Sequence, residues 1–182
     1  RAAVRRHLAT GRAAEAVEHA LALSRLAESG TGIAETRAML QEALSHPGLD
    51  DAVLRRAYVR VARLSWLAGD FAAAKAEAGR QVGLAESAGD HASLGDALAV
   101  LHAEAHRVGD YETAAGLLET ALEVSTGIGD EAGRARTLVG MGNLAMERSE
   151  WEDAEARYME ALDAARHARD PYWETAALVN LG

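Results

Sequence analysis

The sequence predicts an all-α protein built from antiparallel helix pairs that stack in a row. Three observations support this prediction: a composition that favours helix, a repeat every 40 residues, and Gly-Asp dipeptides that punctuate the repeat. The 182 residues are 49% hydrophobic but only 4% aromatic, and they include two prolines. Ala, Leu, Glu and Arg favour helix, and no stretch shows the two-residue alternation of a strand. We therefore expect a helical core of small side chains that lets the helices approach closely.

The 40-residue period runs through the chain without gaps. Four aspartates share one register, Asp50, Asp90, Asp130 and Asp170. Self-similarity at such a period is typical of repeat arrays, in which each unit buries its apolar face against its neighbours. Other positions in register are Ala34, Ala74, Ala114 and Ala154; Phe71, Tyr111 and Trp151; and Leu98, Leu138 and Leu178.

The Gly-Asp dipeptides predict where one helix ends and the next begins. A glycine just past a helix can take the left-handed conformation that closes the last turn. The following aspartate can accept hydrogen bonds from the free amides of the next helix and favours its positive end. Turns this short make neighbouring helices antiparallel. The expected helices are 11–29, 31–47, 51–68, 71–87, 91–108, 111–127, 131–148, 151–168 and 171 onward, with residues 1–9 as the tail of an earlier helix.

Charge and composition exclude several classes of function. The net charge of −9 and the pI near 5.2 argue against nucleic-acid binding by this segment, which needs a basic face. Without cysteine there are no disulfides and no thiolate metal sites. We find neither a spanning apolar stretch nor a signal peptide. We therefore expect a cytoplasmic chain that does not bind membranes.

Two local patterns resemble a metal site and a dinucleotide-binding loop, but neither is complete. His102 and His106 lie four residues apart on one helix face, a spacing that can share a metal ion. No third ligand is evident, and His102 occupies a small-residue position of the repeat, so we expect its ring to pack between helices. The glycines of "GIGDEAG" are spaced one residue too widely for a dinucleotide loop and follow a helix. We predict no catalytic site, no metal site, no cofactor and no enzymatic activity.

Residues 138–162, "LVGMGNLAMERSEWEDAEARYMEAL", resemble a tetratricopeptide repeat. The resemblance covers 51–182 well and 10–50 loosely, although its 40-residue unit is longer than the usual 34. It implies a right-handed superhelix, or α-solenoid, of about four repeats plus a partial one. We expect a single array over 1–182 that is an excerpt of a longer protein. The matching positions are Leu138, Met141, Gly142, Ala145, Trp151, Ala154, Tyr158 and Ala161, with His102 in place of the glycine one repeat earlier.

The resemblance also implies a function. Arrays of this kind bind a protein or peptide along their concave face, so we expect an interaction scaffold. Forty-residue versions with Gly-Asp turns are similar to those of polarity adaptors and of large bacterial transcription activators of the maltose-activator type. The alternative is therefore the arm of a transcription regulator that senses a partner or a small inducer. The last helix is expected to expose Leu178 and Leu181. We therefore expect the chain to self-associate through this uncapped end.

In this family the first helix of each pair lines the concave face, which gives a set of candidate binding residues. The arginines would suit a ligand that carries carboxylates, and Trp66 and Met146 would give apolar contacts. Ordinary surface and packing roles remain the alternative for each of them. Val59, Ala99 and Val139 stand where the chaperone-tail clamp of the family needs lysine, which disfavours that ligand. The candidates are Arg56, Arg63, Trp66, Asp96, His106, Arg107, Arg136, Asn143, Met146 and Glu147.

Overall fold

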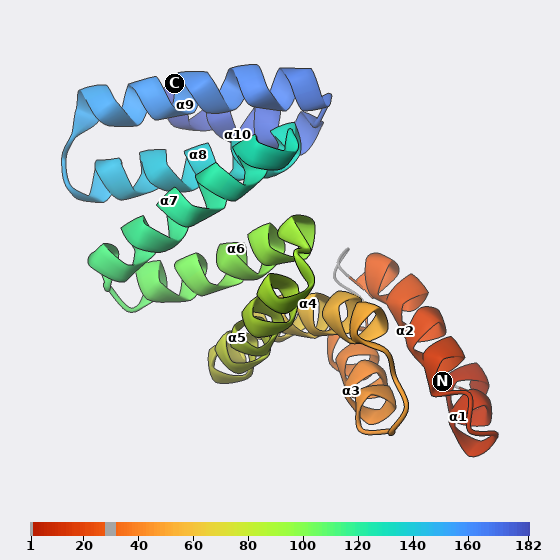
Figure 1. The fold of residues 1–182 in the computed structure, drawn as a ribbon. Helices are drawn as coiled ribbons and strands as arrows, with labels where there is room; N and C mark the ends of the chain where they lie inside the picture. The colour runs from red at the N-terminus through yellow and green to blue at the C-terminus, as the bar shows by residue number, and fades with distance from the viewer. Residues whose placement is uncertain (1, 28–31) are drawn as a thin grey trace. The chain divides into compact units, whose positions relative to one another are not determined.

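A computed structural model describes residues 2–27 and 32–182 of the chain (Figure 1). In these ranges the chain forms ten α-helices and no strand, which confirms the predicted all-α fold. The helices are α1 (Ala2–Ala9), α2 (Ala13–Ala27), α3 (Ile33–Leu44), α4 (Asp51–Leu67), α5 (Phe71–Ala88), α6 (His91–Arg107), α7 (Tyr111–Ile128), α8 (Glu131–Glu147), α9 (Trp151–Ala168) and α10 (Pro171–Leu181).

From α4 to α9 each observed helix agrees with its expected bounds to within one residue at either end. The first half of the chain agrees less well. The expected helix ends at 29 and 31 fall outside the described residues, and α3 stops at Leu44 instead of 47. Pro47 explains this early end, because the residue before a proline is disfavoured in the helical conformation. Gly48 then takes a positive φ of 88°.

The Gly-Asp dipeptides at 69–70, 89–90, 109–110 and 129–130 each close one helix and start the next, as the sequence predicts, whereas Gly95-Asp96 lies inside α6. Gly109 has a φ of 80°, and its N–H bonds to the carbonyl of His106 at 3.0 Å. The Asp110 N–H reaches back to the carbonyl of Ala105 at 2.9 Å, which completes the glycine-closed helix end. The Asp110 carboxylate then accepts a hydrogen bond from the Thr113 amide at 3.1 Å. The same side-chain cap forms at Asp50, Asp70, Asp90, Asp130 and Asp170.

Two junctions depart from this pattern. Ser149 and Arg169 hold the left-handed position without being glycine, with φ values of 60° and 53°. Glu150 makes no side-chain cap at the start of α9. The helices nevertheless end where the repeat predicts, so the packing of the pair outweighs the local cost of a left-handed side chain, which is about 1–2 kcal/mol.

The chain divides into two compact units, Arg1–Ala88 (unit 1) and Gly89–Gly182 (unit 2). In unit 2 each helix packs on the next one along the chain, and α6, α8 and α10 also contact one another in sequence. The first helices of successive pairs therefore lie side by side. In unit 1 consecutive helices again pack together, and α2 contacts α4 in the same way.

Small residues let the helices of unit 2 approach closely. Ala161 and Ala177 are fully buried and pack with Leu138 in one core cluster. Gly142 faces the ring of Tyr158, whose side chain is almost fully buried. A Cβ atom on Gly142 would lie 2.4 Å from the Cε1 atom of that ring. The glycine of the repeat is therefore required by the contact between α8 and α9.

We expect Gly142→Ala to lower the free energy of unfolding by about 1–3 kcal/mol, because the new methyl group overlaps the Tyr158 ring. Gly116→Ala is the matched control. Gly116 lies inside α7, and a Cβ atom there meets nothing within 4 Å. This variant should gain about 0.5–1 kcal/mol from the lower backbone entropy of alanine. Urea unfolding followed by tryptophan fluorescence measures both changes, and equal effects of the two substitutions would contradict the steric explanation.

Candidate functional site

The structure divides the ten candidate residues between the two units. Arg56, Arg63 and Trp66 lie on α4 in unit 1, and the other seven lie on α6 and α8 in unit 2. The side of α6, α8 and α10 that carries Asp96, Arg136, Asn143 and Glu147 is called the helix-A surface below.

An ion pair joins α6 to α8 across exactly one repeat period. Arg136 Nη1 lies 3.0 Å from Asp96 Oδ1, and the two residues are 40 positions apart. The Arg136 side chain is 20% exposed, whereas that of Asp96 is 48% exposed. The carboxylate is thus the outer member of this pair, and the guanidinium is the inner one.

Asn143 on α8 has its side-chain carbonyl held from two sides. Its Oδ1 atom accepts a hydrogen bond from Tyr158 Oη at 2.8 Å and another from Asn180 Nδ2 at 3.2 Å. Burial raises the pKa of Tyr158, so its hydroxyl remains protonated and able to donate at neutral pH. Because both bonds end on the oxygen, the orientation of the exposed Asn143 carboxamide is fixed and its amide group points elsewhere.

The end of α6 is tied to α7 and α8 by aromatic and polar contacts. The rings of His106 and Tyr111 lie 5.5 Å apart between centroids. Tyr111 Oη donates a long hydrogen bond of 3.5 Å to Glu147 Oε2. Arg148 Nη2 donates to the carbonyl of Tyr111 at 3.3 Å. Met146, next to Glu147, is 40% exposed, so an apolar side chain adjoins this polar corner.

Arg107 binds a carboxylate of its own helix. Its Nε and Nη2 atoms lie 2.8 Å and 2.9 Å from the two carboxylate oxygens of Glu104, a geometry that satisfies both groups. These hydrogen bonds raise the pKa of Arg107. Glu104 itself is buried. A ligand carboxylate at Arg107 would therefore have to compete with a nearly ideal internal partner.

His102 packs between α6 and α8, as expected for its place in the repeat. A Cβ atom on Gly140 would lie 3.1 Å from His102 Nε2, so the ring occupies the space beside this glycine. Burial lowers the pKa of His102 to about 4, and the charges of His106 and Arg136 add to the effect. The ring is therefore neutral at pH 7. The described residues contain no group of three or more His, Asp or Glu side chains that could hold a metal ion.

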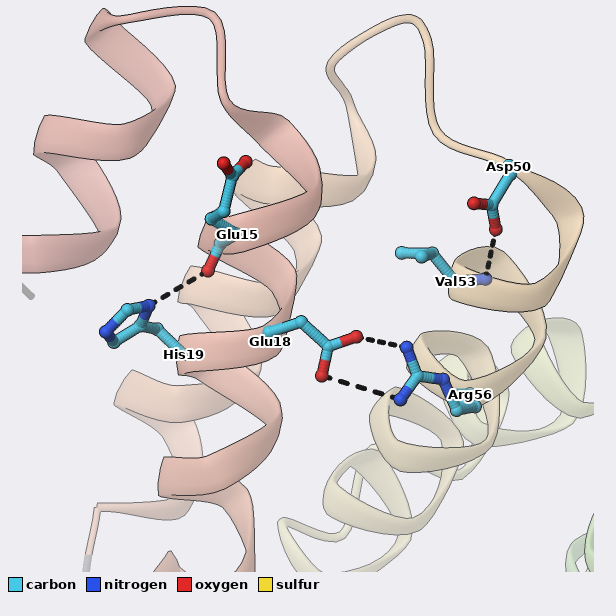
Figure 2. A network of polar contacts seen from close by, with 6 residues as sticks. All are labelled: Glu15, Glu18, His19, Asp50, Val53 and Arg56. Carbon is cyan, nitrogen blue, oxygen red and sulfur yellow. Dashed lines mark hydrogen bonds and ion pairs between the residues drawn. The ribbon is translucent and has the colours of Figure 1, made fainter.

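In unit 1 the candidate Arg56 is also bound to a carboxylate. It forms an ion pair with Glu18 of α2, and Figure 2 shows the two terminal nitrogens of the guanidinium, Nη1 and Nη2, facing the two carboxylate oxygens. Asp50 caps the start of the same helix through the Val53 amide, 2.8 Å away. Trp66 is half-buried, with its ring edge-to-face on Phe71 at 4.8 Å, so much of it belongs to the α4–α5 contact. Arg63 is exposed on α4.

Sequence reasoning found the candidate side chains but missed their partners. Glu18 and Asn180 were not singled out, and Tyr158 was matched only as a position of the repeat, although all three determine how the candidates are held. Several of these contacts join residues about one repeat apart: 38 positions for Glu18 and Arg56, and 37 for Asn143 and Asn180. A search for complementary polar residues near the 40-residue period could have found them.

Comparison with known proteins identifies the repeats. The family model of the tetratricopeptide repeat matches residues 97–167. This part of the chain is similar to tetratricopeptide repeats. The match spans α7, α8 and α9 with most of α6, so it contains the Asp110 and Asp130 junctions and the glycine that meets Tyr158.

Solved structures extend the likeness over the whole chain. The crystal structure of BtubC (BKLC) from P. vanneervenii superposes with a TM-score of 0.78 at 18% identity, over 99% of this chain and 79% of that one. The apo form of RapI gives a TM-score of 0.72 at 14% identity, over 89% of this chain and 46% of that one. At such identities the likeness concerns the fold, and it confirms the predicted α-solenoid of tetratricopeptide-like helix pairs. No curated protein sequence matches the chain significantly.

The helices were also compared with the dimensions of a bilayer. Over residues 2–27 and 32–182, none of them combines the length and the apolar character that crossing a membrane requires.

The neutral state of His102 predicts a loss of stability in acid. Its folded pKa of about 4 lies below the ordinary value of 6.5, so the unfolded chain takes up the proton first. The contribution to stability is complete above pH 6.5 and is lost as the pH falls toward 4, by up to about 3 kcal/mol. We expect His102→Gln to flatten the decline in unfolding free energy between pH 7 and pH 5. Parallel pH profiles for the two proteins would contradict this role.

Proposed function

We propose that this chain is a non-enzymatic scaffold that binds an extended segment of a partner protein on the helix-A surface of unit 2. The observation that carries the proposal is the fixed carboxamide of Asn143. Hydrogen bonds from Tyr158 and Asn180 hold its oxygen, which leaves the amide N–H groups as donors for a main-chain carbonyl of the partner. A donor that is already oriented loses little side-chain entropy on binding.

The surroundings of Asn143 suit such a segment. Met146 lies about one turn further along α8 and is 40% exposed, while Val179 on the neighbouring α10 is 71% exposed. Apolar side chains next to an oriented polar group are the usual composition of a binding surface. A standard interface buries about 800 Å² on each partner, which three adjacent helices can provide. The candidates of unit 1, Arg56, Arg63 and Trp66, stay a separate proposal for that unit alone.

The arginines have a smaller part in this proposal than the sequence suggests. Arg56, Arg107 and Arg136 are bonded to Glu18, Glu104 and Asp96. Any acidic ligand must compete with these internal carboxylates, and the bidentate pair of Arg107 is costly to break. Recognition therefore rests on Asn143 and its neighbours, with the arginines shaping the surface.

Asn143→Ala should weaken binding of a partner peptide by about tenfold, the value of one hydrogen bond of about 1–1.5 kcal/mol. Peptides selected on the immobilised protein from a random displayed library serve as probes, and fluorescence anisotropy gives their affinities. Thr120→Ala is the control, because Thr120 is an exposed polar residue on α7. Its affinity should be unchanged. Selected peptides that bind the Asn143 variant as tightly as the parent protein would overturn the proposal.

A second candidate function is the sensing arm of a larger regulator, such as a transcription regulator that responds to a partner or a small inducer. The observation that favours it is the partial coverage of RapI, since a fold like this one makes up only 46% of that chain. A ligand that binds the folded state raises the melting temperature by mass action. We expect at least one member of a dialysable metabolite library to raise it. A silent screen beside a successful peptide selection would favour the scaffold instead.

A further inference from the structure

The two units differ strongly in charge. Unit 1 contains twelve Lys and Arg residues against ten Asp and Glu residues, a formal charge of +2. Unit 2 contains seven against eighteen, a formal charge of −11. The whole net charge of −9 is therefore an average of two unlike halves. A field of this size attracts cationic partners to unit 2 and speeds their association.

Most positive charges of unit 2 are already paired inside the unit. At least five of its seven arginines form ion pairs with its own carboxylates. The remaining acidic excess is open to solvent. The α7 helix carries three glutamates and no Lys or Arg at all. A basic partner would therefore meet few unpaired cations on this unit. The paired arginines are Arg107, Arg134, Arg136, Arg157 and Arg166.

On the helix-A surface two carboxylates face outward on either side of Asn143. Asp96 is the exposed member of its pair with Arg136. Glu147 is exposed, and among the residues that the structure describes it forms no ion pair. Arg136, Asn143 and Glu147 follow one another on α8 at spacings of seven and four residues, which places them along one side of the helix. The 11 residues from Arg136 to Glu147 correspond to about 16 Å along α8.

We propose that the segment bound on this surface is basic, with two Lys or Arg residues four or six positions apart. One cation would lie beside Asp96, the other beside Glu147, and the main chain between them would accept a hydrogen bond from Asn143. The spacing follows from the geometry, because an extended chain rises about 3.3 Å per residue and turns alternate side chains to the same face, so positions four or six apart are about 13 Å or 20 Å apart on that face and bracket the distance along α8. This inference rests on the proposed function, since it names the partner of the same surface.

The two carboxylates provide specificity more than affinity. Exposed ion pairs contribute little each, and salt screens them. Two of them change binding by about tenfold at low ionic strength, and the effect should shrink at 0.5 M salt. The Asn143 hydrogen bond is not screened in this way. Salt dependence therefore separates the two parts of the interaction.

The test selects peptides from a random displayed library on the parent protein and on charge variants. The parent should enrich Lys or Arg pairs four or six positions apart. Glu147→Gln keeps an acceptor for Tyr111 but removes the charge, so it should lose the enrichment at one of the two positions. Its matched control is Glu119→Gln, which removes one exposed carboxylate from α7. That variant should retain the full enrichment.

A second variant separates local recognition from overall charge. Asp96→Asn combined with Arg136→Gln removes the ion pair and leaves the net charge unchanged, so it should lose the enrichment at the other position. Neutral or acidic peptides selected by the parent, or an equal loss in the Glu119 control, would overturn the inference. If peptides depend on Asn143 but carry no basic pair, only this inference fails. If no selected peptide depends on Asn143, the proposed function fails with it.

Discussion

The hydrogen bonds of the Gly-Asp junction are the constraint on which the rest of the structure depends. One residue, such as Asp110, uses its main-chain N–H to close the helix behind it and its carboxylate to start the helix ahead. The glycine before it supplies the left-handed turn. Because both helix ends are fixed within a few residues, the helices have nearly constant length and reverse direction at each junction. Within each unit, neighbouring pairs consequently stack in register, with residues about 40 positions apart on adjacent helices.

That register decides what can lie between the helices. Alanines at 154, 161 and 177 leave room for close approach, and Gly142 admits the ring of Tyr158 against α8. The same ring then positions Asn143 through its hydroxyl group. A packing requirement of the core is thus linked directly to the orientation of a surface donor. The His102 ring, by contrast, orients no surface group. It fills the space beside Gly140, and burial lowers its pKa.

The sequence predicts the helices of the second half almost to the residue, because their ends are set by local chemistry that the printed sequence contains. It predicts α3 less well, since the Gly-Asp signal is replaced there by Pro47 and Gly48. The candidate binding residues were placed on the correct helices, but their ionic partners were not foreseen. Whether Arg136 is available to a ligand depends on its ion pair with Asp96. This pair results from the packing of α6 on α8 and not from a local sequence pattern. The division into two units likewise has no sequence signal at residues 88 and 89.

The bonds that cross one repeat period bear on how such a chain can change its length. Asp96 with Arg136, and Asn143 with Asn180, join neighbouring pairs through residue types that differ from one pair to the next. Copying or deleting a 40-residue segment would preserve most junctions and the stacking, since these recur in most of the repeats. It would also set unmatched side chains against each other at the new boundary. One repeat could therefore replace another without changing the fold, but its side chains match only those of its own neighbours. The order of the repeats along the chain is thus part of what the sequence specifies.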